Sequence, residues 1–260
     1  MNQVISVILN RRSVRAYTEQ AIAEDVKELI LQAAMRAPTA GNLMLYSIIE
    51  VKDQAAKSTL AVTCDHQPFI AKAPLVLLFL ADYQRWYDYF QLSGVEQLCA
   101  QGGEPMRRPE EGDLFLACCD ALIAAQTAVI AAESLGIGSC YIGDIMENYE
   151  THRDLFHLPQ YTFPIALVCF GYPTKQQRER PLTTRYDRRF IVFEDRYERL
   201  EPEALQAMHG ERQERVLRAQ DEPAGIRNEG QRVYRNKFSA DFSKVMSRSV
   251  RAILRAWTGE

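Results

Sequence analysis

Three arginines and a serine lie within five residues near the start of the chain, in the stretch RRSVR. They are Arg11, Arg12, Ser13 and Arg15. The planar guanidinium group binds phosphate through two parallel hydrogen bonds, and a serine hydroxyl adds a neutral donor. This stretch is therefore a candidate anion clamp. Taken alone, it also suits a basic turn exposed to solvent, and that alternative stays open.

A second basic stretch, GYPTKQQRERP, follows Phe170. Arg178 and Arg180 alternate there and would be able to complete a phosphate site with the first stretch. The alternative is an exposed basic loop to which Lys175 and Arg185 also belong.

Small and polar residues mark three further stretches. In APTAGN, Pro38, Thr39 and Asn42 combine close backbone approach with hydrogen-bonding side chains that suit the edge of a polar ring. In HQPF, the amide of Gln67 offers a donor and an acceptor, which suits an imide. In GSCYIG, the backbone amides are able to point at a ring nitrogen. Ordinary turns, with GSCYIG as a tight helix-to-strand connection, are the alternatives.

Familiar catalytic and nucleotide motifs are absent from the sequence. Gly136, Gly138 and Gly143 do not fit G-x-G-x-x-G, and there is no Gly-Lys pair, His-Glu-x-x-His or G-x-S-x-G. The six cysteines include no Cys-x-x-Cys pair, and the four histidines are scattered. We therefore expect no metal site, and buried reduced thiols in a reducing compartment.

The composition indicates a globular protein: 47% of the 260 residues are hydrophobic, and the net charge is −3. Bulk nucleic-acid binding is not favoured by that charge. The polar N-terminal stretch does not suit a signal peptide. The apolar run 121–132 is interrupted by Gln126 and Thr127, so we expect it to fall short of a membrane span. A soluble, cytoplasmic protein is expected.

Several segments with clear periodicity must position these residues. Val4 to Leu9 and Glu24 to Ala37 have helical spacing, and an Ala- and Leu-rich run from Leu114 to Gly136 predicts a buried central helix. Three apolar runs predict strands: Leu45–Val51, Pro74–Asp82 and Phe163–Gly171. The order of these elements favours an α+β fold, with a mixed sheet sandwiched by helices.

Two segments stand apart from this core. Residues 83–112 are a candidate lid. Its aromatics Tyr83, Trp86, Tyr87 and Phe90 either pack against the core or a partner, or stack on an acceptor or a nicotinamide. Arg107 and Arg108 are candidates for the 2′-phosphate of NADPH or are simply solvated. In residues 200–260 we expect a helix over 201–220, a linker over 221–231 and an amphipathic helix over 238–257.

Together and in this order, RRSVRAYT, PTAGN, ESLGIGSCYIG and FGYP with its basic tail resemble the nitroreductase family of FMN enzymes. The resemblance covers roughly residues 1–197. It implies a mainly antiparallel sheet in an intertwined homodimer, with FMN at the interface and touched by both subunits. It also implies that hydride passes from NAD(P)H through flavin N5 to nitroaromatic, quinone or flavin acceptors in a ping-pong scheme.

The resemblance also assigns positions by motif. Arg11, Arg12, Ser13 and Arg15 would lie at the FMN phosphate and ribityl chain, and Arg178 and Arg180 would close over the phosphate. Gln67 would face the ribityl chain or the pyrimidine edge, and Tyr141, Ile142 and Gly143 would lie near the central nitrogens of the ring. Pro38, Thr39 and Asn42 would come from the partner subunit. Met44-Leu45-Tyr46 and the spacing of Arg178 and Arg180 depart from the family pattern.

On this interpretation residues 1–199 form the FMN domain and residues 200–260 a helical extension. No catalytic side chain is expected, because the flavin carries the chemistry. Two alternatives remain: an FMN enzyme of the same scaffold that acts on its own ligand without nicotinamide, and a non-catalytic protein that binds partners through its C-terminal arm. The physiological acceptor and the preference for NADH or NADPH are not readable from the sequence.

Overall fold

A computed structural model describes residues 2–218 and 225–259, and its centre is a four-stranded sheet. The strands are β1 (Tyr46–Glu50), β2 (Leu75–Asp82), β3 (Gly138–Ile142) and β4 (Thr162–Gly171), in the order β1-β2-β4-β3. Every neighbouring pair is antiparallel. The α+β fold and the mainly antiparallel sheet are thus confirmed.

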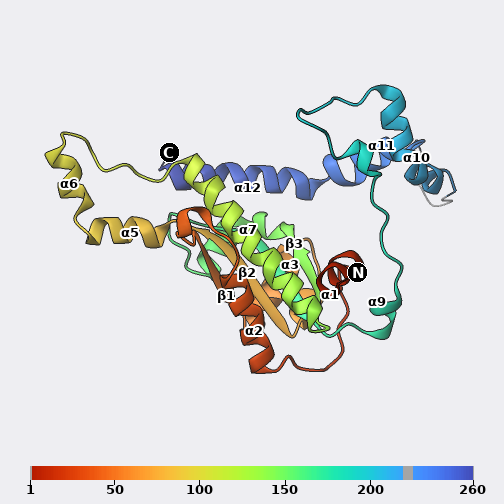
Figure 1. The fold of residues 1–260 in the computed structure, drawn as a ribbon, viewed down its shortest axis with the longest axis horizontal. Helices are drawn as coiled ribbons and strands as arrows, with labels where there is room; N and C mark the ends of the chain where they lie inside the picture. The colour runs from red at the N-terminus through yellow and green to blue at the C-terminus, as the bar shows by residue number, and fades with distance from the viewer. Residues whose placement is uncertain (1, 219–224, 260) are drawn as a thin grey trace. The chain divides into compact units, whose positions relative to one another are not determined.

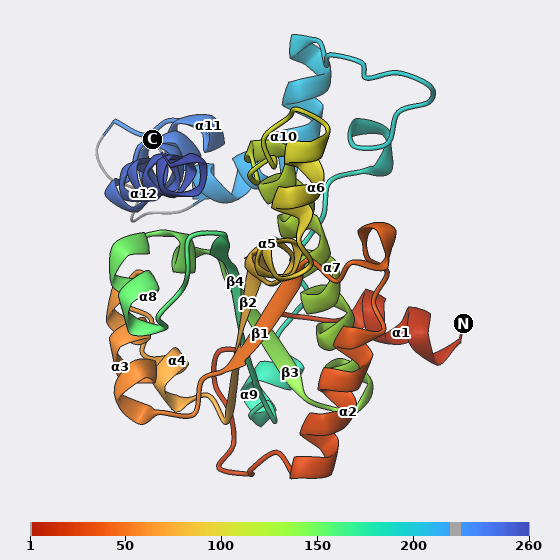
Figure 2. The same cartoon turned by 90° about the vertical axis from the view of Figure 1, so that its left-hand side faces the viewer.

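Helices cover both faces of this sheet (Figure 2). On one face lie α2 (Glu24–Met35) and α7 (Glu111–Ser134), and on the other lie α3 (Gln54–Thr63), α4 (Phe69–Lys72) and α8 (Tyr149–Leu155). Alternation along β2 explains the two layers: Leu77 and Phe79 pack toward α2 and α7, whereas Val76 and Leu78 pack toward α3 and α4. All eight residues of β2 are buried, as expected for a strand covered on both sides.

The predicted central helix is α7, and it begins with a capping box formed by Glu110 and Asp113. A row of alanines, with Ala121 and Ala128 at its centre, packs against the sheet and α2. In length and composition α7 would be able to cross a membrane, so the expectation that its apolar run is too short was wrong. Its packing on the sheet identifies it as a core helix with one uncovered apolar side.

That uncovered side carries large apolar side chains, and Phe115 is 68% exposed. Leu116, Leu122 and Ile123 are exposed on the same helix, as are Val4 and Ile8 of the neighbouring helix α1 (Gln3–Asn10).

Cys119 of α7 is exposed as well, so the expectation of buried thiols holds for Cys64, Cys140 and Cys169 but not for Cys119. Burial raises the pKa of Cys64 to about 12.

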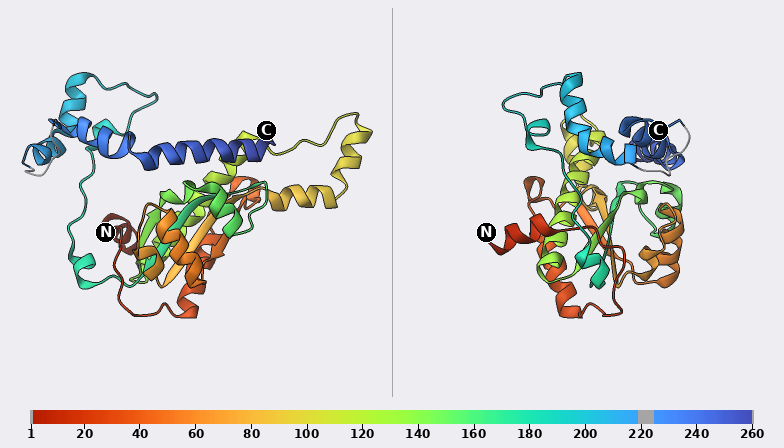
Figure 3. Two further views of the ribbon diagram at one scale, coloured as in Figure 1. Left: turned by 180° about the vertical axis from the view of Figure 1, so that it is seen from behind. Right: turned by 90° about the vertical axis from the view of Figure 1, so that its right-hand side faces the viewer.

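The segment between β2 and α7 contains α5 (Gln84–Leu92) and α6 (Val95–Gln101), which stand away from the sheet (Figures 1 and 3). Helix α12 (Asp241–Thr258) returns to the sheet domain from Val245 onward. There Trp257 and Ile253 are buried among Leu114, Tyr161 and Phe163. The predicted amphipathic helix is therefore present and covers its own domain.

Two compact units are formed, one of residues 1–182 with 245–260 and the other of residues 183–244. The second contains η3 (Arg188–Phe190), α10 (Pro202–Arg218), α11 (Glu229–Val233) and a π-helical turn η4 (Tyr234–Phe238). The linker predicted over 221–231 is wrong from Glu229 on, where α11 begins, and residues 221–224 lie outside the described residues. The boundary at residue 199 stays a prediction.

Candidate functional site

The Arg11–Thr18 segment lies against the ends of β3 and β4. Val14 N donates to Ser139 O at 2.8 Å, and Thr18 N donates to Tyr172 O at 2.8 Å. Two glycines permit this approach: a Cβ on Gly138 would lie 2.9 Å from Val14 Cβ, and one on Gly171 would lie 2.7 Å from Tyr17 Cγ. Any larger residue would push the segment away. Gly138–Ile142 of GSCYIG are thus strand β3 with a structural first glycine, so the alternative of a tight helix-to-strand connection does not hold for these residues.

The two basic stretches meet at this place. Arg180 Nη2 donates to Ser13 O at 2.6 Å, and Arg15 N donates to Gln177 Oε1 at 3.2 Å. Helix α9 (Lys175–Glu179) supplies Gln177 and Arg178, and Thr174 caps it by accepting from Gln177 N. Stretches separated by more than 150 residues in the sequence therefore form one basic cluster, made of Arg11, Arg12, Ser13, Arg15, Arg178 and Arg180.

Two donors in this basic cluster have no acceptor. Arg11 Nη1 and Arg12 Nε are buried, and neither has a hydrogen-bond partner among the described residues. Buried guanidinium N–H groups are costly when they are unpaired, so such atoms in a native fold indicate a ligand that accepts from them. An anionic phosphate or a polyhydroxyl chain suits this donor set. The residues present therefore fit the phosphate and ribityl portions of FMN.

A cavity of about 280 Å³ borders the cluster. Arg12, Arg178 and Gln177 line it together with Glu133 near the end of α7. Burial raises the pKa of Glu133, while Arg11, a hydrogen bond from Ser139 and Arg12 pull the pKa in the opposite direction. Glu133 is thus a carboxyl group that competes for the same guanidinium charge.

The Pro38–Asn42 turn is organised by one buried aspartate in the middle of α7. Asp120 is 2% exposed and accepts hydrogen bonds from Thr39 Oγ1, from Ala40 N at 3.0 Å and from Leu45 N at 3.1 Å. Thr39 Oγ1 in turn accepts from Met44 N at 2.8 Å. The hydroxyl of Thr39 is therefore fully engaged within the protein, and Thr39 O also accepts from Asn42 N at 3.3 Å.

This turn contains η1 (Ala40–Asn42), and its residues Gly41 and Asn42 have φ of 54° and 59°. Pro38, Thr39 and Asn42 line a cavity of about 370 Å³, and Asn42 is exposed. Asp120 and Glu133 are about 20 Å apart along α7, at 1.5 Å per residue. Within one chain, therefore, the turn and the basic cluster lie at well-separated positions along this helix.

Gln67 and the end of β3 lie near each other. Gln67 Nε2 donates to Cys64 O at 3.0 Å and to Asp144 Oδ2 at 2.7 Å. Asp144 belongs to η2 (Gly143–Met146), which directly follows β3. Tyr141 is half-buried and Gly143 is exposed with open space around it, but the Ile142 side chain is 1% exposed in the core. Only the backbone of Ile142 is thus able to meet a ligand.

Three acidic residues that organise the candidate site could not be identified from the sequence. Asp120 is one polar residue in an apolar helix, and Asp144 and Glu147 follow a strand end without a motif. Glu147 is 5% exposed, and burial together with the charges of Asp144 and Asp65 raises its pKa to about 7. Only the tertiary contacts identify these three residues.

The aromatic residues after β2 pack largely on their own unit. Trp86 Nε1 donates to Leu43 O at 2.8 Å, and the rings of Tyr87 and Tyr161 meet edge to face at 4.9 Å. Arg107 donates to Asp113 through two bonds of 2.6 and 2.9 Å, so its guanidinium group is held by a residue of the capping box of α7. Arg108 remains exposed.

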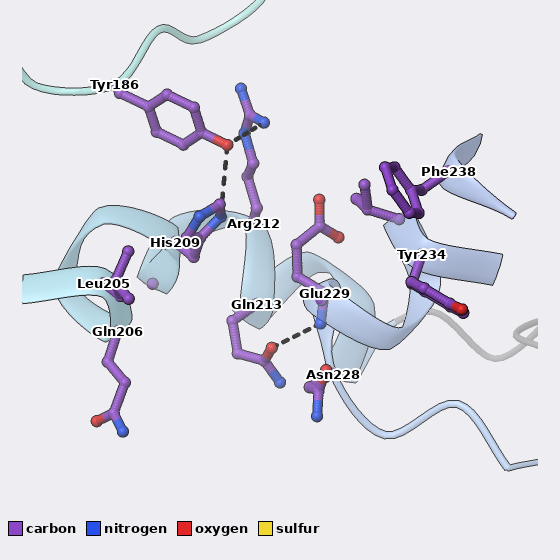
Figure 4. Close-up of a pocket in the computed structure, with 13 residues that line it drawn as sticks. Tyr186, Leu205, Gln206, His209, Arg212, Gln213, Asn228, Glu229, Tyr234 and Phe238 are labelled. Carbon is purple, nitrogen blue, oxygen red and sulfur yellow. Dashed lines mark hydrogen bonds between the residues drawn. The ribbon is translucent and has the colours of Figure 1, made fainter. Parts of the chain in front are cut away.

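A separate cavity of about 850 Å³ lies within the unit of residues 183–244 (Figure 4). Tyr186 and Arg212 stack at 4.1 Å on one side, with His209 beside them, and Tyr234 and Phe238 lie on the other side. None of the residues predicted for FMN lines this cavity.

Across the described residues of the whole chain, no cluster of three or more His, Cys, Asp or Glu side chains suits a metal ion.

Comparisons with known proteins agree on one family. A model of the nitroreductase family matches residues 8–172. An NAD(P)H-linked FMN reductase of Bacillus subtilis is 32% identical over 70% of either chain. An oxygen-insensitive NADPH nitroreductase of Salmonella typhimurium is 29% identical over 79% of this chain and 79% of its own length. The crystal structure of nitroreductase A from Vibrio parahaemolyticus superposes with a TM-score of 0.79 at 26% identity, and 98% of each chain is covered.

Proposed function

Because the chain belongs to the nitroreductase family, we propose that it binds FMN between two copies of itself and reduces nitroaromatic, quinone or flavin acceptors with NAD(P)H. It is an NAD(P)H-dependent FMN oxidoreductase, so the non-catalytic alternative falls away. FMN, when bound, supplies the hydride chemistry. The observation that carries the site proposal is the pair of buried, unpartnered donors on Arg11 and Arg12.

The basic cluster would bind the phosphate and ribityl chain. Arg11 and Arg12 offer the unpartnered donors, and Ser13 is held in place through the bond from Arg180 to its carbonyl. Arg15 and Arg178 add positive charge to the same surface. Because these groups are fixed by β3, β4 and α9 before a ligand arrives, little ordering entropy is lost on binding.

The ring would be met by residues of both copies. Gln67 would face its pyrimidine edge, while Tyr141, the backbone of Ile142 and Gly143 would line its centre. Pro38, Thr39 and Asn42 would reach it from the partner, which agrees with their separation from the basic cluster along α7. Their part would be to shape the site and exclude water, and no side chain is assigned to proton transfer.

The uncovered apolar side of α7 supports a homodimer. Phe115, Leu116, Leu122 and Ile123 expose a contiguous stretch of large side chains, and α1 adds Val4 and Ile8. A soluble monomer rarely leaves such a surface open. A second copy would cover it, and the same assembly would bring the partner's Pro38–Asn42 turn to the FMN. In this dimer the partner subunit, and not a membrane, would cover the apolar side of α7.

The first test removes two arginines, in the double variant Arg11→Ala with Arg15→Ala. Each charge-assisted bond contributes about 1.5–3 kcal/mol, so we expect the Kd for FMN to rise about 100-fold or more. Gel filtration should still show a folded dimer. Lys175→Ala, an exposed cation on α9 paired only loosely with Glu179 at 3.9 Å, is the matched control and should keep the wild-type Kd.

Tight FMN binding by the double variant would contradict the site proposal.

Anaerobic addition of NADH or NADPH then tests the reaction itself. We expect either nicotinamide to bleach the flavin absorbance, and a nitroaromatic or quinone added afterwards to restore it, as a ping-pong scheme requires. A flavin that neither nicotinamide reduces would favour the alternative in which the enzyme acts on its own ligand.

A further inference from the structure

The amide of Gln67 is fixed in one orientation. Its nitrogen donates to Cys64 O at 3.0 Å and to Asp144 Oδ2 at 2.7 Å. A backbone carbonyl only accepts, so the amide nitrogen and not its oxygen must face Cys64. An amide group has two N–H donors, and both are used by these two contacts. Gln67 is therefore unable to donate to a ligand without losing a bond inside the protein.

The amide oxygen is the group that remains. Among the described residues Gln67 Oε1 has no hydrogen-bond partner, and the side chain is half-buried. Toward a ligand Gln67 thus presents an acceptor. Such a group favours an N–H edge over a carbonyl edge, because two facing acceptors would leave both oxygens unpaired.

Asp144 is the anchor of this arrangement, and its surroundings are acidic. Glu147 is 95% buried, with its Oε1 atom lacking a partner among the described residues, and Asp65 approaches from the loop between α3 and α4. From α12, Ser249 donates its hydroxyl to Glu147 O at 2.8 Å and so fixes the backbone of this loop. Burial, together with the charge of Asp144 and a hydrogen bond with it, raises the pKa of Glu147 to about 7.

We propose that Asp144 is a positioning residue that fixes Gln67 as a hydrogen-bond acceptor for the imide N–H of the flavin. The proposal rests on the proposed FMN site and deepens it, because it names what selects the edge of the ring. Without Asp144 the Gln67 side chain keeps only its bond to Cys64 O, and one of its N–H groups becomes available. Gln67 then loses its fixed role as an acceptor.

The experiment compares FMN with 3-methyl-FMN, which lacks the imide hydrogen, by titrating the apo-protein of each variant and following flavin fluorescence. We expect wild type to bind FMN at least 10-fold more tightly than 3-methyl-FMN. Asp144→Leu should reduce this ratio several-fold and weaken FMN binding about 10-fold. Asp144→Asn should restore both values to within about 3-fold, since its amide oxygen still accepts from Gln67. Asp154→Asn, an exposed carboxyl on α8, is the control for lost charge.

Gln67→Leu gives a second route if Asp144→Leu fails to fold, and it should likewise lower the ratio. An unchanged ratio in Asp144→Leu or in Gln67→Leu would overturn the proposal. The proposed function is separable from this result. If wild type takes up FMN and Arg11→Ala with Arg15→Ala releases it, the site stands even when the Asp144 variants behave like wild type.

Discussion

The Pro38–Asn42 turn and the basic cluster satisfy their polar groups in opposite ways. In the turn, Asp120 accepts from Thr39, Ala40 and Leu45, so the donors are matched within the chain. In the cluster, Arg11 Nη1 and Arg12 Nε have no acceptor among the described residues. The turn is therefore stabilised by hydrogen bonds within the chain, whereas the cluster keeps two donors that a ligand would be able to satisfy.

The largest effect is expected from Asp120→Ala, which removes the shared acceptor of the turn. Three donors lose their partner, and the Leu45 N–H is fully buried. At about 1–3 kcal/mol for each orphaned buried group, the free energy of unfolding should fall by about 3 kcal/mol or more. Urea denaturation of the apo-protein measures this. A loss below about 1 kcal/mol would mean that the turn does not depend on Asp120.

Gly138→Ala should act on the cluster instead. The added methyl group meets Val14, so the Arg11–Arg15 segment must shift, at about 1–3 kcal/mol of stability. We expect the Kd for FMN to rise at least 10-fold. Gly112→Ala near the start of α7 is the matched control, because nothing lies within 4 Å of its new methyl group. Equal FMN affinities in the two variants would show that the close approach at Gly138 is unimportant.

The smallest effect is expected from Glu133→Gln. The pKa of Glu133 is raised by burial, so its stabilising contribution is present below the ordinary pKa of a glutamate and is lost as the pH rises through the folded value. In wild type the Tm should thus fall with pH across this window, and the variant should lack that part of the decline. Without the competing carboxylate, FMN should also bind about 2–5-fold more tightly at pH 8. Weaker binding would show that Glu133 instead orients Arg11 or Arg12.

Sequence patterns were sufficient to predict those elements whose residue types favour one structure or one kind of ligand. The strand at Pro74–Asp82 followed from its apolar run, and the two arginine stretches followed from the chemistry of guanidinium groups. Strand β3 was missed because GSCYIG begins and ends in glycine, and its strand form depends on pairing with β4, an interaction of tertiary origin. Asp120 and Asp144 were missed for a related reason. Their partners lie 75 or more residues away, and nothing local distinguishes them from surface carboxylates.

The placement of the Arg11–Thr18 segment by Ser139, Tyr172 and Gln177 has a consequence for biosynthesis. During translation the arginines emerge first, yet the strand and helix that fix them are made more than a hundred residues later. Such long loops close slowly, and their entropy is recovered only when β4 and α9 are complete. The basic cluster is therefore complete only after β4 and α9 have been made and have folded.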